Sequence, residues 1–487
     1  MNKKLNLLFG ILLFCITYIT AQEYPKVIFP GDYPDPSILR DGKDYYMTHS
    51  SFSYSPGFLI WHSQDLVNWE PLCRVNGAGM APDLAKYGDI YYIYFPWGST
   101  NYVVWAKDMK GPWSKPVNLK VKGIDPGHIV DKDGNRYLHL SEGTAVRLAK
   151  DGLSVIGTPV TVYEGWEYPK DWNTECYCLE SPKLTYKDGY YYLTSAEGGT
   201  AGPATSHMVV SARARNVMGP WENSPYNPIV HTYSADDEWW SKGHGSLVDD
   251  VNGNWWIVYH AYAKDFHTLG RSTLLEPVEW TNDGWFRTKS TATLPSADTM
   301  SRKGISDISD DFSGKELDIR WSTFGSTPEK CTTLKNSSLL LQPKGDSPEN
   351  GRVLLTIPTH KSYEAQVEVN IDKQNNGGLL LFYKPKVFAG IACNEKEFII
   401  YNNHELYHRI PNTIGTHVFL KIVNKQNNCS IWISGNDKKW EKVADSIDVK
   451  QMNHNNYNGF RSLRIALYAS GEGTVNFRDF RYTNRTK

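Results

Sequence analysis

Short runs of apolar and aromatic residues alternate with turns along the chain, and no long stretch shows the 3.6-residue apolar period of a helix. Five times in the first 260 residues, a turn that contains a glycine leads into a run of aromatic side chains. The glycines of these turns lie 46, 46, 55 and 64 residues apart, at Gly42, Gly88, Gly134, Gly189 and Gly253. A repeat of about 40–50 residues, each copy a turn that leads into a β-rich run, is the signature of a propeller blade.

A second recurring segment follows the aromatic runs and indicates the outer part of a blade. It combines a turn with a tryptophan, as at residues 63–69, 110–113, 218–221 and 277–280. The Gly-Pro-Trp copies are typical of a turn with an aromatic side chain inserted between blades. We therefore predict a five-bladed β-propeller over residues 22–300, with four strands in each blade.

The repeat stops near Ser296, where a polar stretch as far as Asp310 is typical of a linker. A chain of 487 residues is long enough for two domains. Over residues 309–487, alternating runs separated by turn signals favour a β-sandwich. These runs cover residues 338–342, 353–357, 365–371, 379–383, 398–401, 418–423, 429–433 and 463–468. The predicted fold class is thus all-β, a propeller followed by a sandwich.

Composition and charge narrow the range of partners. The formal net charge is -1 and no long run of one sign occurs, which argues against nucleic acid and anionic membrane surfaces as partners. Aromatic residues make up 13% of the chain, a content that suits both sheet packing and stacking on carbohydrate. No segment after the N-terminal region is apolar enough to span a bilayer. The sequence leaves the oligomeric state open.

The N-terminal segment, residues 1–21, is typical of an export signal. Lys3 and Lys4 precede an apolar run over residues 5–19, and Ala21 offers a small residue for cleavage. A lipid anchor is the alternative, but the bulky Phe14 precedes Cys15 where that signal needs a small residue. We therefore predict a secreted or periplasmic protein.

Six cysteines remain after this segment, at positions 73, 176, 178, 331, 393 and 429. Six in so long a chain do not form a disulfide framework. Cys176 and Cys178 are separated by one residue, and a bridge between them is expected to be strained. We therefore expect all six to be small buried side chains.

Three acidic residues lie in tight settings that hold a carboxylate rigidly. Asp35 stands between two prolines, Asp125 precedes Pro126, and Glu180 begins a Glu-Ser-Pro segment. Each precedes an aromatic run at the start of a predicted blade, and the first strand of a blade lines the propeller axis. We expect the three carboxylates to converge at one end of the central channel. The alternative is that they are turn caps, a common role for aspartate.

Converging carboxylates are typical of glycosidic bond hydrolysis. That reaction needs one protonated carboxylic acid for the leaving oxygen and one ionised carboxylate as base or nucleophile. A third carboxylate nearby raises the pKa of the acid, because like charges resist joint ionisation.

Several segments resemble glycoside hydrolase family 43. Six ordered motifs carry the resemblance over nearly the whole predicted propeller: residues 29–37, 123–126, 180–184, 196–200, 243–247 and 269–271. The part from Asp310 onward resembles the concanavalin-like β-sandwich that follows the propeller in β-xylosidases of that family. The resemblance implies an inverting hydrolase built on a five-bladed propeller.

The resemblance also implies roles for individual residues. Asp35 matches the general base, Asp125 the carboxylate that tunes pKa and orientation, and Glu180 the general acid. Arg271 matches an arginine that contacts the sugar and supports the acidic cluster, with a surface strand position as the alternative. Inversion needs room for a water, so the working carboxylates are expected about 6.5–9.5 Å apart.

His244 matches a histidine near the propeller axis that faces a hydrated calcium ion in many relatives. It is the candidate for a structural Ca²⁺ site, although calcium prefers oxygen ligands and a neutral structural histidine is the alternative. The chemistry itself requires no cofactor.

One departure from the family pattern bears on the substrate. Met80 stands where the family usually has a tryptophan that walls the sugar site, so the pocket shape is expected to differ. Candidates for an aromatic sugar platform are Phe52, Trp61, Trp97 and Trp166, with blade packing as the alternative for each. Asp32 and Glu175 lie close to the motifs without matching them, and either could line the pocket.

The leading hypothesis is an exported exo-acting glycosidase that removes terminal β-D-xylose or α-L-arabinofuranose from plant-polysaccharide oligosaccharides with inversion. The sandwich favours exo action, because in relatives it packs on the propeller and narrows the pocket. One alternative is the same fold acting on galactose or a pectic side-chain arabinose. The other is a carbohydrate-binding propeller without catalysis, which has no need for a buried acid cluster.

Overall fold

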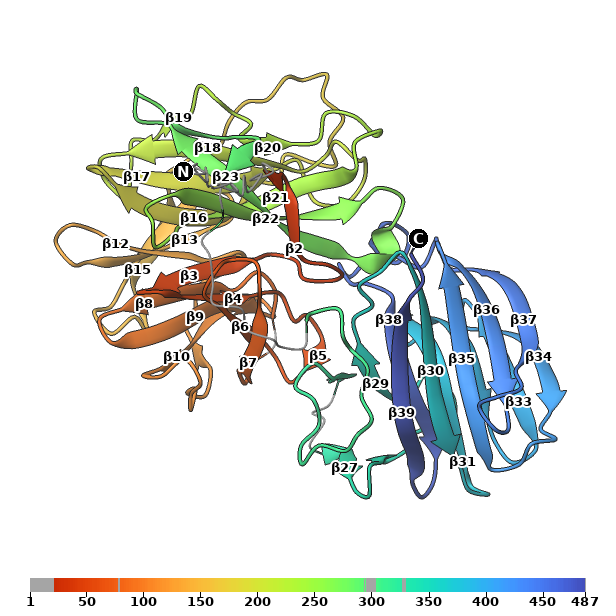
Figure 1. The fold of residues 1–487 in the computed structure, drawn as a ribbon. Helices are drawn as coiled ribbons and strands as arrows, with labels where there is room; N and C mark the ends of the chain where they lie inside the picture. Colours follow the sequence, from red (N-terminus) through yellow and green to blue (C-terminus); the bar gives the residue numbers. More distant parts are fainter. Residues whose placement is uncertain (1–21, 78, 293, 295–303, 326–329, 487) are drawn as a thin grey trace, which may run out of the picture.

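The computed structural model describes residues 22–77, 79–292, 294, 304–325 and 330–486. The predicted signal segment and most of the predicted linker lie outside these residues. The chain is built almost entirely of strands, and the helices within these residues are η1 (His267–Leu269) and α1 (His454–Tyr457). None of these helices has the length or apolar character needed to cross a bilayer. The structure confirms the all-β prediction of a five-bladed propeller followed by a sandwich (Figure 1).

The first three blades are four-stranded antiparallel sheets in chain order. Blade 1 contains β3 (Ser37–Asp41), β4 (Asp44–Thr48), β6 (Leu59–Ser63) and β7 (Glu70–Arg74). Blade 2 contains β8 (Asp83–Tyr87), β9 (Ile90–Trp97), β10 (Thr100–Ala106) and β11 (Val117–Asn118). Blade 3 contains β12 (Gly127–Val130), β13 (Arg136–Leu140), β14 (Thr144–Leu148) and β15 (Val155–Thr161).

The last two blades each have a fifth short strand, which the prediction of four strands missed. Blade 4 contains β16 (Glu180–Lys187), β17 (Tyr190–Glu197), β18 (Met208–Ala214) and β19 (Glu222–Asn223), with β20 (Val230–His231) also on β18. Blade 5 contains β21 (Trp239–Asp249), β22 (Trp255–Ala263), β23 (Arg271–Trp280) and β2 (Lys26–Phe29), and β24 (Phe286–Thr288) also pairs with β23. β19 pairs with only one end of β18, and β20 pairs with the other end. In the same way, β24 and β2 pair with different parts of β23.

An early segment of the chain closes the ring of blades. β2 (Lys26–Phe29) pairs with β23, so the chain enters through the last blade before it forms the first (Figure 1). A separate two-stranded ladder joins β1 (Gln22–Glu23) to β25 (Thr291–Ala292). Contacts far apart in sequence thus hold the two ends of the propeller region together.

The five glycines of the repeat lie in the turns between the first and second strands of the blades. Their φ angles run from +58° to +83°, a region in which glycine avoids the steric cost of a side chain. The repeat is therefore a hairpin signal, and the aromatic run after each glycine is the second strand of a blade.

Two facing sheets form the sandwich. One contains β34 (Glu405–Pro411), β33 (Glu397–Asn402), β32 (Val387–Cys393), β31 (Asn375–Lys384), β38 (Arg464–Gly471), β29 (Arg352–Thr356) and β26 (Ser322–Phe324). The other contains β27 (Thr332–Leu334), β28 (Leu339–Leu341), β39 (Val475–Asn484), β30 (Ser362–Asn370), β35 (His417–Lys425), β36 (Asn428–Ser434) and β37 (Glu441–Asp448). All eight predicted runs are strands or overlap one.

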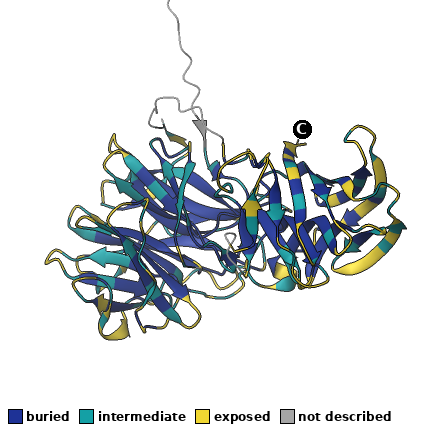
Figure 2. Ribbon diagram, turned by 90° about the horizontal axis from the view of Figure 1, so that it is seen from below, coloured by how far each residue is buried: buried dark blue, intermediate teal, exposed yellow. Residues whose placement is uncertain are grey.

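Buried residues run through the blades and along the facing sides of the two sandwich sheets (Figure 2). The sandwich has one large apolar core, whereas the propeller core is divided into clusters between neighbouring blades. Trp113 of a Gly-Pro-Trp segment packs against the cluster between blades 1 and 2 and donates its indole N–H to the Met109 carbonyl at 3.1 Å. This tryptophan fills the space between blades, as the sequence predicts.

The two parts of the chain share backbone and ionic contacts. β5 (Tyr54–Ser55), from the propeller region, pairs with β26 and completes the sandwich sheet as its eighth strand. Asp32 and Arg464 form a buried ion pair across the junction at 3.1 Å. The Leu463 N–H also donates to the Thr268 carbonyl at 2.8 Å. These contacts fix the sandwich against the side of the propeller.

Candidate active site

Each blade carries a residue with an unusual backbone conformation, at the start of the innermost strand in blades 1 to 4 and within that strand in blade 5. Asp35, Ala81, Asp125, Ser181 and His244 have φ between +43° and +58°. This region is uncommon for residues other than glycine, and such residues cluster at active sites where the surrounding fold enforces the conformation. The prolines around Asp35 and after Asp125 therefore fall at a sharp bend that leads into the strand. The fivefold recurrence of this bend brings side chains from different blades to the axis.

Asp35 lies at the centre of a dense polar network. Its Oδ1 accepts a hydrogen bond from Arg271 Nη1 at 2.9 Å, and its Oδ2 accepts one from the Ser50 hydroxyl. The Nδ1 atom of His260 lies 3.1 Å from both the backbone N and the Oδ1 of Asp35. One ring nitrogen serves only one of these partners at a time, and in a neutral imidazole it can accept from the N–H. The network fixes the orientation of the carboxylate.

Asp125 and Glu180 lie beside this network. Asp125 Oδ2 accepts the Ser181 N–H at 3.1 Å, which ties blade 3 to the residue after Glu180. The buried Lys183 ammonium bonds to Asp83 Oδ1 at 2.9 Å and to the Pro126 carbonyl at 3.0 Å. All three predicted carboxylates, together with Arg271 and His244, line one pocket of about 120 Å³.

The three carboxyl groups have divergent pKa values. Burial raises the pKa of Asp35, but the Arg271 guanidinium opposes this effect, and the pKa is held well below its usual range. Burial and the charge of Asp35 raise the pKa of Asp125 to about 7. Burial, Asp125 and Asp35 raise the pKa of Glu180 well above its usual range. Groups with separated pKa values are the arrangement that acid–base chemistry needs.

Three buried histidines surround the carboxylates. His244 Nδ1 lies 3.6 Å from Asp35 Oδ1 and 3.9 Å from Asp125 Oδ2, and His207 Nε2 lies 3.9 Å from Glu180 Oε1. Burial lowers the pKa of His260 to about 4 and lowers those of His207 and His244 well below their usual range. All three imidazoles are therefore neutral near pH 7.

The histidines also test the predicted calcium site. Asp35, His244 and His260 bring ligand atoms within 4.8 Å of one another. They do not fit a directly bound Ca²⁺, which takes about six to eight oxygen ligands, because the one carboxylate among them is already paired with Arg271. His244 Nε2 has no hydrogen-bond partner among the described residues and is the atom left for a hydrated ion. The calcium site stays a prediction.

The predicted sugar-contacting residues divide into two groups. Phe52 and Met80 line the pocket that contains the three carboxylates, and Met80 is 39% exposed. Trp97 lies outside this lining, because it ends β9 at a hairpin tip and is 53% exposed. Trp61 is buried in a blade core, so it also lies outside the lining. Trp166 is half-buried and outside the lining as well, and its backbone N–H donates to Glu197 Oε1 at 2.7 Å.

The two acidic residues outside the motifs lie in different parts of the molecule. Asp32 is buried at the junction with the sandwich, where it pairs with Arg464. Glu175 lines the pocket of the three carboxylates, and its Oε2 accepts the Ala201 N–H at 2.8 Å.

Several residues of the site were missed by sequence reasoning. Ser50, His260 and Thr200 belong to the network around Asp35, and the His260 ring lies 3.3 Å from the Thr200 hydroxyl. Phe460 of the sandwich lines the pocket and lies 5.7 Å from the Arg271 guanidinium. Its position depends on how the two parts of the chain dock, for which the sequence carries no local signal.

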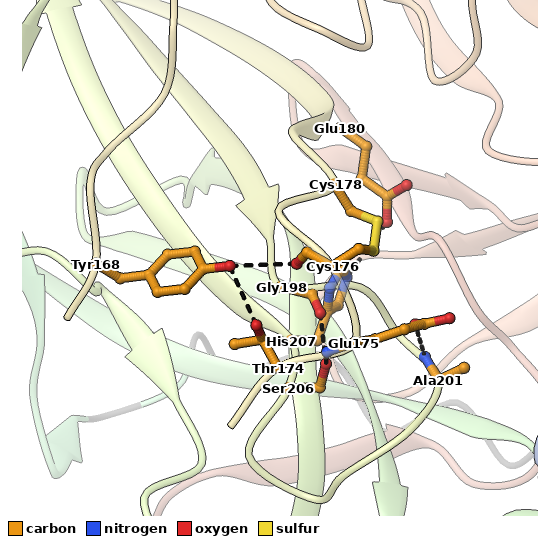
Figure 3. The surroundings of a disulfide bond; sticks show 10 residues. All are labelled: Tyr168, Thr174, Glu175, Cys176, Cys178, Glu180, Gly198, Ala201, Ser206 and His207. Atoms are coloured by element: carbon orange, nitrogen blue, oxygen red, sulfur yellow. Dashed lines mark hydrogen bonds and ion pairs between the residues drawn. A yellow bond between two sulfur atoms is a disulfide. The ribbon is translucent and has the colours of Figure 1, made fainter. Parts of the chain in front are cut away.

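The expectation about Cys176 and Cys178 is wrong, because the two form a disulfide. Cys178 has φ +43°, and this bend brings the two Cα atoms to 5.3 Å, within the usual range for a disulfide. The bridge lies beside Glu180 and Glu175 (Figure 3). The cysteines at positions 331, 393 and 429 are buried as expected, whereas Cys73 is half-buried.

Comparison with known proteins supports the arrangement. The model of glycosyl hydrolases family 43 matches residues 24–286, and that of the beta xylosidase C-terminal concanavalin A-like domain matches residues 309–483. A xylan 1,3-beta-xylosidase of a Vibrio species is 33% identical over 308 residues, which cover 53% of this chain and 56% of that protein. The chain thus spans about half the length of several curated relatives.

Two further relatives match nearly the whole chain. A non-reducing end alpha-L-arabinofuranosidase of Bacteroides ovatus is 28% identical over 519 residues, covering 94% of this chain and 93% of that protein. The crystal structure of a family 43 protein from Bacillus licheniformis has a TM-score of 0.84 and 26% identity, covering 95% of this chain and all of that one. The family model matches more than half of the chain, in the same residues that form the propeller. The chain belongs to family 43 of the glycosyl hydrolases.

Proposed function

We propose that this protein is an exo-acting glycoside hydrolase that removes terminal β-D-xylose or α-L-arabinofuranose from plant-polysaccharide oligosaccharides. The observation that carries the proposal is one pocket lined by three carboxyl groups with separated pKa values. The names of the relatives, a xylosidase and an arabinofuranosidase among them, supply the sugar class.

The proposed mechanism assigns a role to each carboxyl group. Asp35, held ionised by Arg271, accepts a proton from a water that attacks the anomeric carbon. Glu180, held protonated by burial and its neighbours, donates a proton to the leaving oxygen. Asp125 keeps the pKa of Glu180 high. Attack by water on the face opposite the leaving group inverts the anomeric carbon.

Exo action is supported by the position of the sandwich. Phe460 comes from the segment between α1 and β38 and lines the same pocket as Asp35 and Glu180. The sandwich therefore forms part of the wall around the sugar. A pocket closed on this side accepts the end of a chain more readily than its middle.

Export from the cytoplasm is supported by the disulfide. Disulfides persist in oxidising compartments and are rare in the cytosol of mesophiles. The Cys176–Cys178 bridge therefore agrees with the predicted signal segment and with a secreted or periplasmic protein.

The pKa pattern predicts the pH dependence of kcat/KM. Because the pKa of Asp35 is low, the base stays ionised and activity falls only at strongly acidic pH. Because the pKa of Glu180 is raised, activity falls at high pH only above the usual glutamate range. Asp125→Asn removes a charge that raises this pKa, so the alkaline limb of the profile is expected to move to lower pH. A pH profile of kcat/KM measures the shift, and an unmoved limb would contradict the role of Asp125.

The proposal is tested by proton NMR of the products from arabinoxylan and arabinan oligosaccharides. We expect one pentose released from the chain end, first in the inverted anomeric form. Release of galactose instead would favour the alternative sugar, which the replacement of the usual tryptophan by the pocket-lining Met80 keeps open. Binding without any released sugar would favour the non-catalytic alternative.

A further inference from the structure

A second, larger cavity adjoins the catalytic pocket. It extends over blades 2, 3 and 4 and has a volume of about 990 Å³, against about 120 Å³ for the pocket. Ile124, Cys178 and Glu180 line both cavities, so the two are continuous at the proposed acid. We call the second cavity the side groove.

The position of Glu180 indicates which part of the substrate would lie in the side groove. A general acid protonates the oxygen of the leaving group, so the leaving part of the substrate must lie beside that carboxyl group. The side groove begins at Glu180 and continues away from the pocket that holds Asp35. This step relies on the proposed function.

Tyr177 offers a rigid aromatic surface in the wall of the side groove. Its side chain is 42% exposed and lines the groove. The ring stacks on Tyr168, which stacks on Trp172, which in turn stacks on His231, with centroid distances of 5.8, 6.3 and 4.5 Å. The Tyr177 hydroxyl donates to the Glu164 carbonyl at 2.8 Å. A ring held in this way loses little conformational freedom when a sugar packs on it.

The disulfide braces the loop that carries this ring. Cys176 and Cys178 flank Tyr177, and the Tyr168 hydroxyl donates to the Cys176 carbonyl at 3.2 Å (Figure 3). The Gly198 N–H donates to the Tyr177 carbonyl at 2.9 Å. A Cβ atom on Gly199 would lie 2.9 Å from the Cys176 sulfur, so glycine at this position leaves room for the bridge.

The lining of the side groove suits a neutral sugar chain. Its lining includes four residues that carry hydroxyl groups, Ser99, Ser141, Thr144 and Thr161, together with Ile124 and the Tyr177 ring. The lining carries charges of both signs, Lys122 and the two glutamates Glu142 and Glu164, so it offers an acidic sugar no overall attraction. At about 990 Å³, the cavity lies at the upper end of the usual range for a small-molecule site, which leaves room for more than one sugar unit.

We propose that the side groove binds the leaving-group side of the oligosaccharide over more than one sugar unit, with the disulfide-braced Tyr177 ring as its platform. The protein then prefers longer oligosaccharides, because units beyond the cleaved bond contribute to binding.

The test compares Tyr177→Ala, Tyr177→Phe and Tyr186→Ala in the Glu180→Gln background, so that substrate is not consumed. Titration calorimetry measures the binding of xylo- and arabino-oligosaccharides of two to five units. We expect Tyr177→Ala to weaken binding of the longer chains by about tenfold, from the lost contact area. Tyr177→Phe keeps the ring and its stacking on Tyr168 but loses the bond to the Glu164 carbonyl, so it should bind much more tightly than Tyr177→Ala and close to its background. Tyr186 is similarly exposed at 54% but lies outside the groove, so its substitution should change nothing.

Equal binding by Tyr177→Ala and its background would overturn the proposal, as would affinity that does not rise with chain length. Equal losses in the Phe and Ala variants would also overturn it, since the hydroxyl anchor would then be responsible. Hydrolysis of nitrophenyl pentosides by the protein with Glu180 intact is measured separately. Its absence would refute the proposed function, while the calorimetry still decides whether the side groove binds sugar.

Discussion

Asp35→Asn and Glu180→Gln are each expected to lower kcat/KM on oligosaccharides by about a hundredfold to ten-thousandfold. Both substitutions keep the shape of the side chain and remove its acid–base function. The Asp35 carboxylate is held by Arg271, Ser50 and His260, so the amide loses the base while the pocket stays filled. The Glu180 amide has no proton to give to the leaving oxygen.

The roles of Asp35 and Glu180 can be distinguished with substrates whose leaving groups differ in their need for a proton. A dinitrophenyl glycoside departs without protonation, so Glu180→Gln should recover most of its activity on that substrate while Asp35→Asn should not. Steady-state kinetics on both substrates measures the difference, and circular dichroism checks the fold of each variant. Recovery by Asp35→Asn, or full activity of either variant on oligosaccharides, would contradict the assignment.

Arg464→Leu is expected to lower the free energy of unfolding by about 3–5 kcal/mol. The substitution leaves the Asp32 carboxylate buried without its partner at the junction of propeller and sandwich. Asp32 Oδ1 already has no hydrogen-bond partner within the described part of the chain, so the ion pair through Oδ2 is its main compensation. Urea denaturation followed by tryptophan fluorescence measures the loss.

The control is an ion pair of the same type on the surface. Arg287 and Glu279 lie 2.6 Å apart and are 55% and 39% exposed, so Arg287→Leu should cost less than about 1 kcal/mol. Adding Asp32→Asn to Arg464→Leu should recover part of the stability, because it removes the unpaired charge. If it recovers none, the loss came from the packing of the Arg464 guanidinium on the Tyr54 ring, 3.4 Å from its centroid.

The junction also links stability to the proposed chemistry. Phe460 lies four residues before Arg464, and its ring helps to form the wall of the pocket that contains Asp35. A loosened junction would therefore open the pocket as well as destabilise the fold. β5, the strand from the propeller region that completes the sandwich sheet, also holds the two parts of the chain together at this junction.

The architecture can be predicted from the amino-acid sequence, because the same local chemistry repeats in every blade. Each hairpin needs a glycine at positive φ, and the strand after it needs aromatic side chains to pack between blades. The glycine spacing therefore predicts both the fold and the number of blades. A bend at the start of the innermost strand recurs in blades 1 to 4, which is why the positions of Asp35 and Asp125 in the repeat are enough to predict that both lie near the axis.

The rest of the site depends on the packing of the whole chain. His260, Thr200 and Phe460 lie far from Asp35 in sequence. The closed ring of blades and the docking of the sandwich bring them to the pocket that contains Asp35. The Cys176–Cys178 bridge depends on a left-handed bend at Cys178 and on the space left by Gly199. The contacts of His260, Thr200 and Phe460 join distant segments whose local sequences have no common pattern. Local propensity does not encode them, because they form only when the blades and the sandwich have come together.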